Sequence, residues 1–180
     1  MHDACLSYKN QAAEAITHYC DIKVESDADE LKLVGKTGKP ATISHWGMTQ
    51  LCSRAGAPAS YIRDLPANLA ADNLNHGLRE RANQDEEANL LFHLNQGTEN
   101  FVLRAMVSER YTRIWNSDVT RRLLQLQDDN PNWRNPLAYK VIEASKNGEW
   151  PTFSDEMEPS GLYASGHDMF AFLCDESKSF

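Results

Sequence analysis

Residues Leu90 to Gln127 read LLFHLNQGTENFVLRAMVSERYTRIWNSDVTRRLLQLQ. Two apolar runs enclose a polar turn, and a short aromatic and basic segment then leads into a helix with apolar periodicity. Leu90 to Leu94 is predicted to pair with the second run as a hairpin, and the polar link Asn95 to Asn100 is long enough for a bulge or a longer loop. Alternation in the second run assigns one face of a strand to Phe101, Leu103, Ala105 and Val107, and the other to Val102, Arg104, Met106 and Ser108.

A helix is predicted to follow this hairpin. Asn116 or Ser117 can cap it, and Asp118 stands near the positive end of its dipole. We expect the helix to run from Asp118 to Gln127 and to pack on the sheet. Its apolar residues are Val119, Leu123, Leu124 and Leu126.

Three helical pieces are predicted before the hairpin. Ser44 can cap the first, and Gly56 stands where a left-handed helix end is needed. Pro58 favours the start of a second, short helix that ends before Pro66. The third is expected from Ala67 to about Arg81, with one side formed by Leu69, Asn73, Leu74 and Leu78.

The first two pieces match a helix-turn-helix, which allows two interpretations. In one, Ser60, Tyr61 and Arg63 face a DNA major groove. In the other, the helix pair simply packs on the sheet. The second helix is short and its arginine is balanced by Asp64 in an acidic chain, so the structural interpretation is favoured.

The first 43 residues predict an N-terminal helix and short strands. The helix is indicated by Ala12, Ala13, Ala15 and Ile16. Ile22 to Val24 and Leu31 to Val34 alternate as short strands of a small hairpin or a sheet edge. We expect residues 44–180 to form a single α+β domain, in which an antiparallel sheet is built on the central hairpin and the helical segment and the following helix pack on one face.

Composition limits the function classes. The chain has 180 residues, a net charge of -8 and 41% hydrophobic residues, which is typical of a globular protein. The acidic balance argues against indiscriminate binding to nucleic acid or to an anionic membrane, so any polyanion site must be local. Met1 is not followed by a basic segment and an apolar core, so we expect a cytoplasmic protein without a membrane partner.

Catalytic and metal-binding patterns are weak. Four cysteines are scattered without a CxxC pair, which favours free thiols. Cys52 and Cys174 are expected in the core. A superficial zinc pattern is formed by His2, Cys5, His18 and Cys20, but its order and spacing match no known finger. We therefore predict no metal, no cofactor and no catalytic residues, and an enzyme is the least favoured class.

The sharpest chemical signal is a local excess of arginine. From Phe101 to Arg122 there are five basic and two acidic residues, a local charge of +3 in an acidic chain. Guanidinium groups match phosphate geometry, and an aromatic ring can stack on an unpaired base. The predicted surface for single-stranded nucleic acid comprises Arg104, Arg110, Tyr111, Arg113, Arg121 and Arg122.

The same segment has a structural interpretation. Arg104 could pair with a neighbouring acid, while Ile114 and Trp115 could anchor the connection between strand and helix in the core. The two interpretations differ in where the aromatic and arginine side chains point.

Four blocks of sequence carry a family resemblance: GAPASYIRDLPANLAADNLNHGL, FVLRAMVSERYTRIWNSDV, NWRNP and GLYASGHDMFAFL. In this order they resemble the phage/plasmid-like proteins grouped as domain-of-unknown-function family 932, over about Ser44 to Leu173. The residues that match its core motif are Arg104, Ser108, Arg110 and Tyr111, and those that match its helical motif are Gly56, Pro58, Leu65, Pro66, Leu69, Ala70, Asn73 and Leu74.

The resemblance implies a place in phage, prophage or plasmid gene sets, without an activity. Gly166 departs from the acidic residue that members usually carry before the block that contains His167 and Asp168. Members usually continue beyond Phe180, so the resemblance implies that the chain could be truncated there. His167 and Asp168 would point to opposite faces of a strand, which weakens their interpretation as a proton-transfer pair.

Three functions follow from these observations. The favoured one is a mobile-element accessory protein that binds single-stranded nucleic acid. The alternative is an acidic interaction module that engages a host protein, and an uncharacterised enzyme ranks third. DNA, RNA and protein partners, and the oligomeric state, stay open at this stage.

Overall fold

The computed structural model describes residues 2–84, 86–94 and 100–134, with short pieces at 162–164, 169–171 and 173–175. The chain forms two compact units, and each is described by itself. The sheet unit is Gln11–Thr112, and the α5 unit comprises Met1–Asn10 and Arg113–Phe180.

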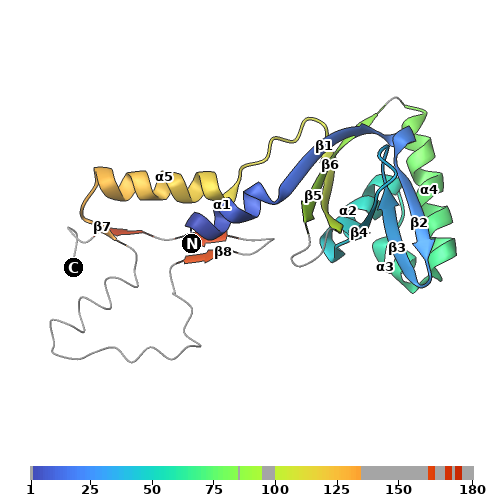
Figure 1. Cartoon of the computed structure of the whole chain (residues 1–180), viewed down its shortest axis with the longest axis horizontal. Helices are drawn as coiled ribbons and strands as arrows, with labels where there is room; N and C mark the ends of the chain where they lie inside the picture. The colour runs from blue at the N-terminus through green and yellow to red at the C-terminus, as the bar shows by residue number, and fades with distance from the viewer. Residues whose placement is uncertain are drawn as a thin grey trace. The chain divides into compact units, whose positions relative to one another are not determined.

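A six-stranded sheet with helices beside it forms the sheet unit (Figure 1). Neighbouring strands are antiparallel except for β4 and β6, which are parallel. The predicted α+β fold and the predicted hairpin, which is β5 with β6, are both confirmed. The order across the sheet is β1 (Ala12–His18), β5 (Glu87–Leu94), β6 (Phe101–Ser108), β4 (Pro40–Ile43), β3 (Glu30–Val34) and β2 (Lys23–Asp27).

A bulge in β6 changes the predicted alternation. Leu91 pairs with Ala105 and Phe92 pairs with Leu103, so Arg104 is an extra residue without a partner on β5. One inserted residue moves the side chain of every later residue in the strand to the opposite face of the sheet. The prediction of strict alternation is therefore wrong past Arg104, and the helix-facing side of β6 carries Phe101, Leu103, Met106 and Ser108.

The three predicted helices of the sheet unit are confirmed. They are α2 (His45–Ala55), α3 (Ala59–Asp64) and α4 (Ala67–Ala82). Ser44 caps α2 by accepting a hydrogen bond from the backbone N–H of Gly47 at 3.0 Å. Gly56 ends α2 in the left-handed region with φ of 71°. Local signals within a few residues of each end therefore decided where α2 begins and stops.

The core lies between these helices and one face of the sheet. α2 packs on β6 and on α4, and α4 packs on β2. Leu74 and Leu78 of α4 are buried in this core, whereas Leu69 and Asn73 are exposed. The buried side of α4 is thus narrower than the side predicted from the sequence, which also included Leu69 and Asn73.

The predicted helix at Ala12 to Ile16 is wrong, because this segment is the strand β1. A helix does precede it, α1 (His2–Asn10), and β1 then pairs with β5 along its whole length. Alanine favours helices by only a fraction of a kcal/mol per residue, so the hydrogen bonds to β5 override that preference. The predicted short strands on either side of residue 28 are confirmed as β2 and β3.

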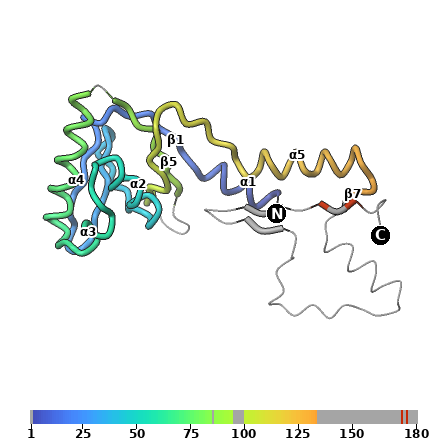
Figure 2. Tube along the Cα trace, turned by 180° about the vertical axis from the view of Figure 1, so that it is seen from behind, coloured from blue at the N-terminus to red at the C-terminus, as the bar shows by residue number. Residues whose placement is uncertain are grey.

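The α5 unit contains two helices that lie side by side, α1 and α5 (Asn116–Asp129), as Figure 2 shows. The helix predicted from Asp118 to Gln127 is confirmed as α5, and within its own unit it packs on α1 and on a short strand. Its N-cap is Trp115, which makes no side-chain cap hydrogen bond, so the caps predicted at Asn116 or Ser117 are wrong. The described part of this unit also contains four short strands: β7 (Trp133–Arg134), β8 (Leu162–Ala164), β9 (Met169–Ala171) and β10 (Cys174–Asp175).

Candidate nucleic-acid interface

The six residues predicted to bind nucleic acid fall into two groups, one in each unit. We call the first the β6 group, which consists of Arg104, Arg110 and Tyr111. The second is the α5 group, which consists of Arg113, Arg121 and Arg122. Because they belong to different units, the two groups are considered as separate surfaces.

The end of β6 presents Arg110 and Tyr111 to solvent. A turn follows the strand, in which the backbone N–H of Tyr111 donates to the carbonyl of Ser108 at 3.0 Å. The Arg110 side chain is 91% exposed, and its Nε lies 3.7 Å from the carboxylate of Glu109. Tyr111 is 48% exposed. A cation and an aromatic ring are therefore both accessible to a ligand at this turn.

Arg104 occupies the bulge of β6. Its carbonyl accepts a hydrogen bond from the Ser44 hydroxyl at 3.5 Å, which links the bulge to the start of α2. The Arg104 side chain is half-buried. Among the described residues no carboxylate forms an ion pair with it, so the predicted pairing with a neighbouring acid is not found there.

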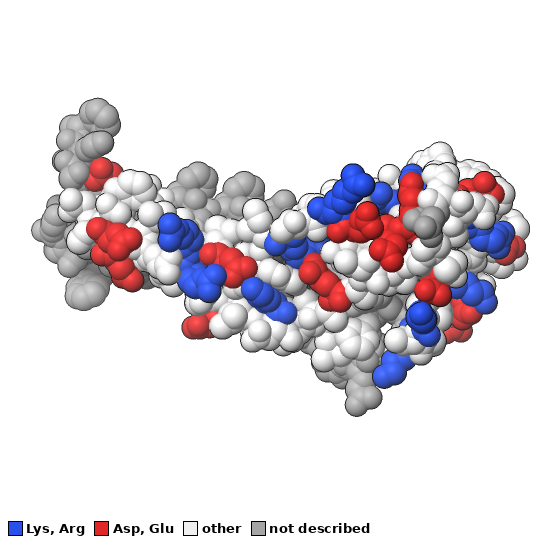
Figure 3. Space-filling model, turned by 90° about the horizontal axis from the view of Figure 1, so that it is seen from above, with Lys and Arg blue, Asp and Glu red and all other residues white. Residues whose placement is uncertain are grey.

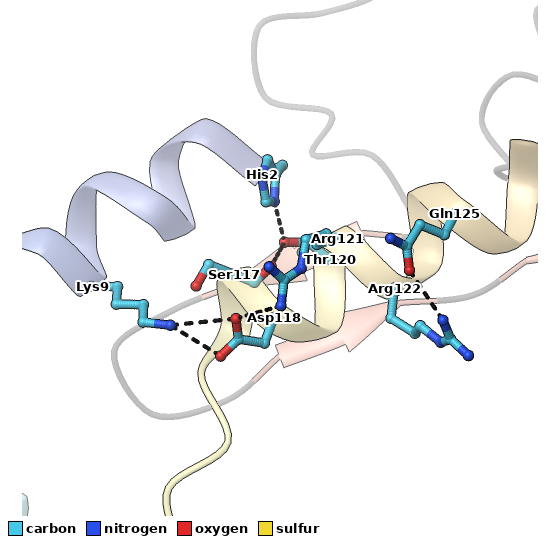
Figure 4. Close-up of polar contacts among 8 residues, drawn as sticks. All are labelled: His2, Lys9, Ser117, Asp118, Thr120, Arg121, Arg122 and Gln125. Carbon is cyan, nitrogen blue, oxygen red and sulfur yellow. Dashed lines mark hydrogen bonds and ion pairs between the residues drawn. The ribbon is translucent and has the colours of Figure 1, made fainter.

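Figure 4 shows the contacts of Arg121 and Arg122, two members of the α5 group, near the start of α5. Asp118 lies 3.1 Å from Lys9 Nζ and 3.2 Å from an Nη of Arg121. Arg122 donates to the side-chain oxygen of Gln125 at 3.1 Å. Two cations, Lys9 and Arg121, thus contact a single acid at the start of α5, and with Arg122 close by on the same helix this surface carries a local positive charge.

Lys9 was missed by sequence reasoning. It belongs to α1 and stands 109 positions before Asp118 in the sequence. The two helices are also joined by His2, whose Nδ1 lies 2.9 Å from the Thr120 hydroxyl. No local pattern indicates such a contact, because it depends on the packing of α1 against α5.

Arg113 is engaged with an aromatic ring. Its guanidinium carbon lies 5.6 Å from the centroid of Trp115, and Lys9 Nζ lies 5.7 Å from the centroid of the same ring. Cation–π contacts of this kind stabilise both partners. Arg113 is half-buried, whereas Ile114 beside it is exposed. Arg113 and Trp115 therefore fit the structural interpretation better than Arg110 does, while Ile114 does not fit it.

The charges on the surface are mixed. On the face drawn in Figure 3, Lys and Arg alternate with Asp and Glu, and the described residues form no broad area of one sign there. Long-range attraction of a polyanion is consequently weak. Any affinity for nucleic acid must come from a few close contacts.

The helix-turn-helix places Arg63 against α2. Its Nη donates to the carbonyl of His45 at 3.2 Å and to the Thr49 hydroxyl at 2.8 Å. These bonds hold α3 on α2 and occupy the arginine that would have read a DNA groove. Arg63 also lines a pocket of about 350 Å³, which is formed mainly by Asp29, Glu30, Leu31, Ile43, Met48, Ile62, Leu65 and Ala70.

The other residues that carry the sequence resemblance described above stand mostly at the ends of elements. Gly56 follows α2, Pro58 and Pro66 precede α3 and α4, and Ser108 ends β6. On α4, the side chain of Asn73 donates to the carbonyl of Leu69 at 2.8 Å. His167 and Asp168 lie outside the described residues.

No group of three or more potential metal ligands occurs among the described residues. Cys5, Cys20 and Cys52 are free thiols, and the imidazole Nδ1 of His18 lies 2.9 Å from the sulfur of Cys20. Burial raises the pKa of the Cys52 thiol, and the positive charge of Arg63 opposes only part of that rise.

These environments predict selective thiol chemistry. At neutral pH iodoacetamide should modify exposed Cys20 well before buried Cys5 and Cys52, because a reagent needs access and the thiolate form. Unfolding in urea should make all three react alike. Peptide mass spectrometry over time measures this order, and equal native rates for Cys20 and Cys52 would contradict the burial of Cys52.

No described helix has the length and apolar character needed to cross a bilayer. Comparisons with known protein families, with curated proteins and with solved structures find no match.

Proposed function

We propose that this chain binds single-stranded nucleic acid through the β6 group, with Arg110 contacting phosphate and Tyr111 stacking on a base. The observation that carries the proposal is the pairing of a 91% exposed guanidinium with a 48% exposed aromatic ring at one turn. A surface that combines a cation with a stacking ring is what sequence-tolerant single-strand binding requires. The resemblance to phage and plasmid proteins would place this binding in the DNA metabolism of a mobile element.

The weak ion pair of Arg110 supports this assignment. An exposed pair such as Arg110 with Glu109 contributes about 0–1 kcal/mol, so a phosphate can displace Glu109 at little cost. The guanidinium of Arg121 already lies 3.2 Å from Asp118, so a phosphate would have to compete with a closer carboxylate there. The α5 group therefore ranks behind the β6 group as a candidate contact for phosphate.

Fluorescence anisotropy with labelled single-stranded DNA, single-stranded RNA and duplex DNA tests the proposal, using the full chain at several salt concentrations. Tyr111→Ala should weaken single-strand binding by a factor that corresponds to about 1–3 kcal/mol, with little change in the salt dependence. Arg110→Ala should weaken binding and also reduce the slope of log K against log salt by about 0.7, since one phosphate contact is lost.

Two matched controls separate specific from general effects. Tyr111→Phe keeps the stacking ring and should bind nearly as wild type does. Arg79→Ala removes an exposed arginine of α4 in the same unit and should change neither affinity nor slope by a comparable amount. Absence of binding at low salt would overturn the proposal and leave a host protein as the favoured partner. Loss of binding in Arg121→Ala but not in Arg110→Ala would move the site to the α5 group.

A further inference from the structure

The pocket of about 350 Å³ that Arg63 lines lies between the helices and one end of the sheet, inside the sheet unit. Five elements contribute residues to it, which are β3, β4, α2, α3 and α4. Its volume is at the lower end of the range for pockets that hold a small organic ligand. Its lining contains no member of the β6 group, so it is a separate feature from the proposed nucleic-acid site.

The walls of the pocket are mainly apolar. Leu33 is buried in the core, and Leu31, two residues earlier on β3, faces the same side of the sheet. Ile43 faces that side too, because it stands two residues after Ala41, the partner of Leu33 on β4. Leu31 and Ile43 line the pocket and are only partly buried, as are Met48 and Leu65. A hydrocarbon chain that covers this open apolar surface is therefore favoured.

Small residues on α4 leave the space open. Ala67 and Ala70 line the pocket, and an alanine side chain ends at Cβ. Ala70 is 1% exposed, so it belongs to the floor, whereas Ala67 at the start of α4 is half-buried. A larger side chain at Ala67 is expected to fill the pocket.

Two acidic side chains border the pocket. Asp29, in the turn between β2 and β3, and Glu30, at the start of β3, both line it and are exposed. In the part of the chain that the structure describes, neither forms an ion pair. Lys32 bonds to Asp27, so its charge acts on Glu30 only over a longer distance. Both carboxylates are therefore accessible to a positively charged ligand.

Arg63 supplies the positive charge of the lining. One Nη of Arg63 donates to the carbonyl of His45 at 3.2 Å and to the Thr49 hydroxyl at 2.8 Å, so both of its hydrogens are used on α2. Two acids and one base give the lining a formal charge of -1. The pocket therefore favours a cation over an anion.

We propose that this pocket binds a small primary amine with an aliphatic body. The ammonium group donates to the carboxylates of Asp29 and Glu30, since charge-assisted hydrogen bonds of this kind are stronger than neutral ones. The hydrocarbon chain lies against Leu31, Ile43 and Met48. An alkylamine is protonated at neutral pH, as a lysine side chain is, so it carries the required charge.

Titration of the full chain with n-hexylamine tests the proposal, followed by NMR of 13C-labelled methionine methyl groups. Met48 lines the pocket, whereas Met106 is buried in the core and reports on general effects. The Met48 signal should shift saturably while the Met106 signal stays in place. Hexanoate has the same chain length and the opposite charge, and it should bind about 3- to 10-fold more weakly, the effect of one or two exposed ion pairs.

Three variants assign the site. Asp29→Asn combined with Glu30→Gln should weaken hexylamine binding by about 3- to 10-fold without weakening hexanoate binding. The matched control is Asp64→Asn, which removes an exposed acid outside the lining and should leave the affinity unchanged. Ala67→Leu should abolish the Met48 shift, and an unchanged Met106 signal shows that this variant keeps its core.

A Met48 signal that does not saturate with hexylamine overturns the pocket as an amine site. Equal affinity for hexylamine and hexanoate, or an equal loss in Asp64→Asn and in the double variant, overturns the role of the two carboxylates. Binding that survives Ala67→Leu places the amine elsewhere and also overturns the proposal. None of these results bears on the nucleic-acid proposal, because the β6 group lies outside the lining.

Discussion

Replacing Gly77 by alanine is expected to lower the free energy of unfolding by about 3 kcal/mol, the upper end of the usual cost of overpacking. Gly77 lies inside α4, where an added Cβ would overlap the carbonyl oxygen of Ala55 and stand 2.6 Å from its carbonyl carbon. Both atoms belong to the backbone of α2, so no change of rotamer can relieve the contact. The nearby bond from Arg81 Nε to the carbonyl of Arg54, at 3.0 Å, holds the two helices together at this point.

Whether Gly77→Ala lowers or raises the free energy of unfolding distinguishes the effect of helix packing from the effect of helix propensity. In an isolated helix, alanine is better than glycine by about 1 kcal/mol, so helix propensity alone predicts stabilisation. Gly35→Ala is the control, because an added Cβ there meets nothing within 4 Å. It should change stability by no more than about 0.5 kcal/mol. Urea unfolding followed by circular dichroism compares the variants, and a Gly77→Ala chain as stable as wild type would show that α2 and α4 are further apart.

Leu74→Ala is expected to destabilise the protein by about 2–5 kcal/mol, the range for deleting a buried leucine side chain. Leu74 is 0% exposed and lies in the core between α4 and the sheet. The loss combines the transfer of the missing methyl groups with the cavity left behind. The same unfolding experiment measures it.

Leu69→Ala is the matched control for Leu74→Ala. Both leucines belong to α4, so the change in helix propensity is the same, but Leu69 is 47% exposed. The control should cost no more than about 1 kcal/mol, since much of the side chain is in water already. Equal losses for the two variants would mean that the sequence pattern, which assigned both leucines to one side, describes the packing better than the structure does.

Much of the candidate site was predictable, because arginine excess and a neighbouring tyrosine are visible in the sequence. The burial of each arginine and the residues that it contacts could not be predicted from the sequence. Arg113 stacks on Trp115 and Arg121 pairs with Asp118, whereas Arg110 combines a 91% exposed side chain with a long ion pair to Glu109. Lys9 joins the α5 group through the packing of two helices that are far apart in the chain.

Signals that act over a few residues were sufficient for several elements. The cap at Ser44, the left-handed turn at Gly56 and the β5–β6 hairpin all depend on groups close together in sequence, and all are present as expected. Composition and alternation likewise indicated an α+β fold. At the two ends of α2 the contact and the residue that provides it lie within a few residues, and the hairpin joins two neighbouring segments, from Leu94 paired with Phe101 to Ala88 paired with Ser108.

Long-range contacts decided the rest. Ala12 to Ile16 form a strand because β5 supplies hydrogen bonds that outweigh the helix preference of alanine. The bulge at Arg104 exchanges the faces of β6, and α5 packs on α1 because their side chains meet across more than a hundred residues. The intrinsic preference of one residue for helix or strand is less than about 1 kcal/mol. Each tertiary contact instead depends on a partner residue that no short window of sequence contains.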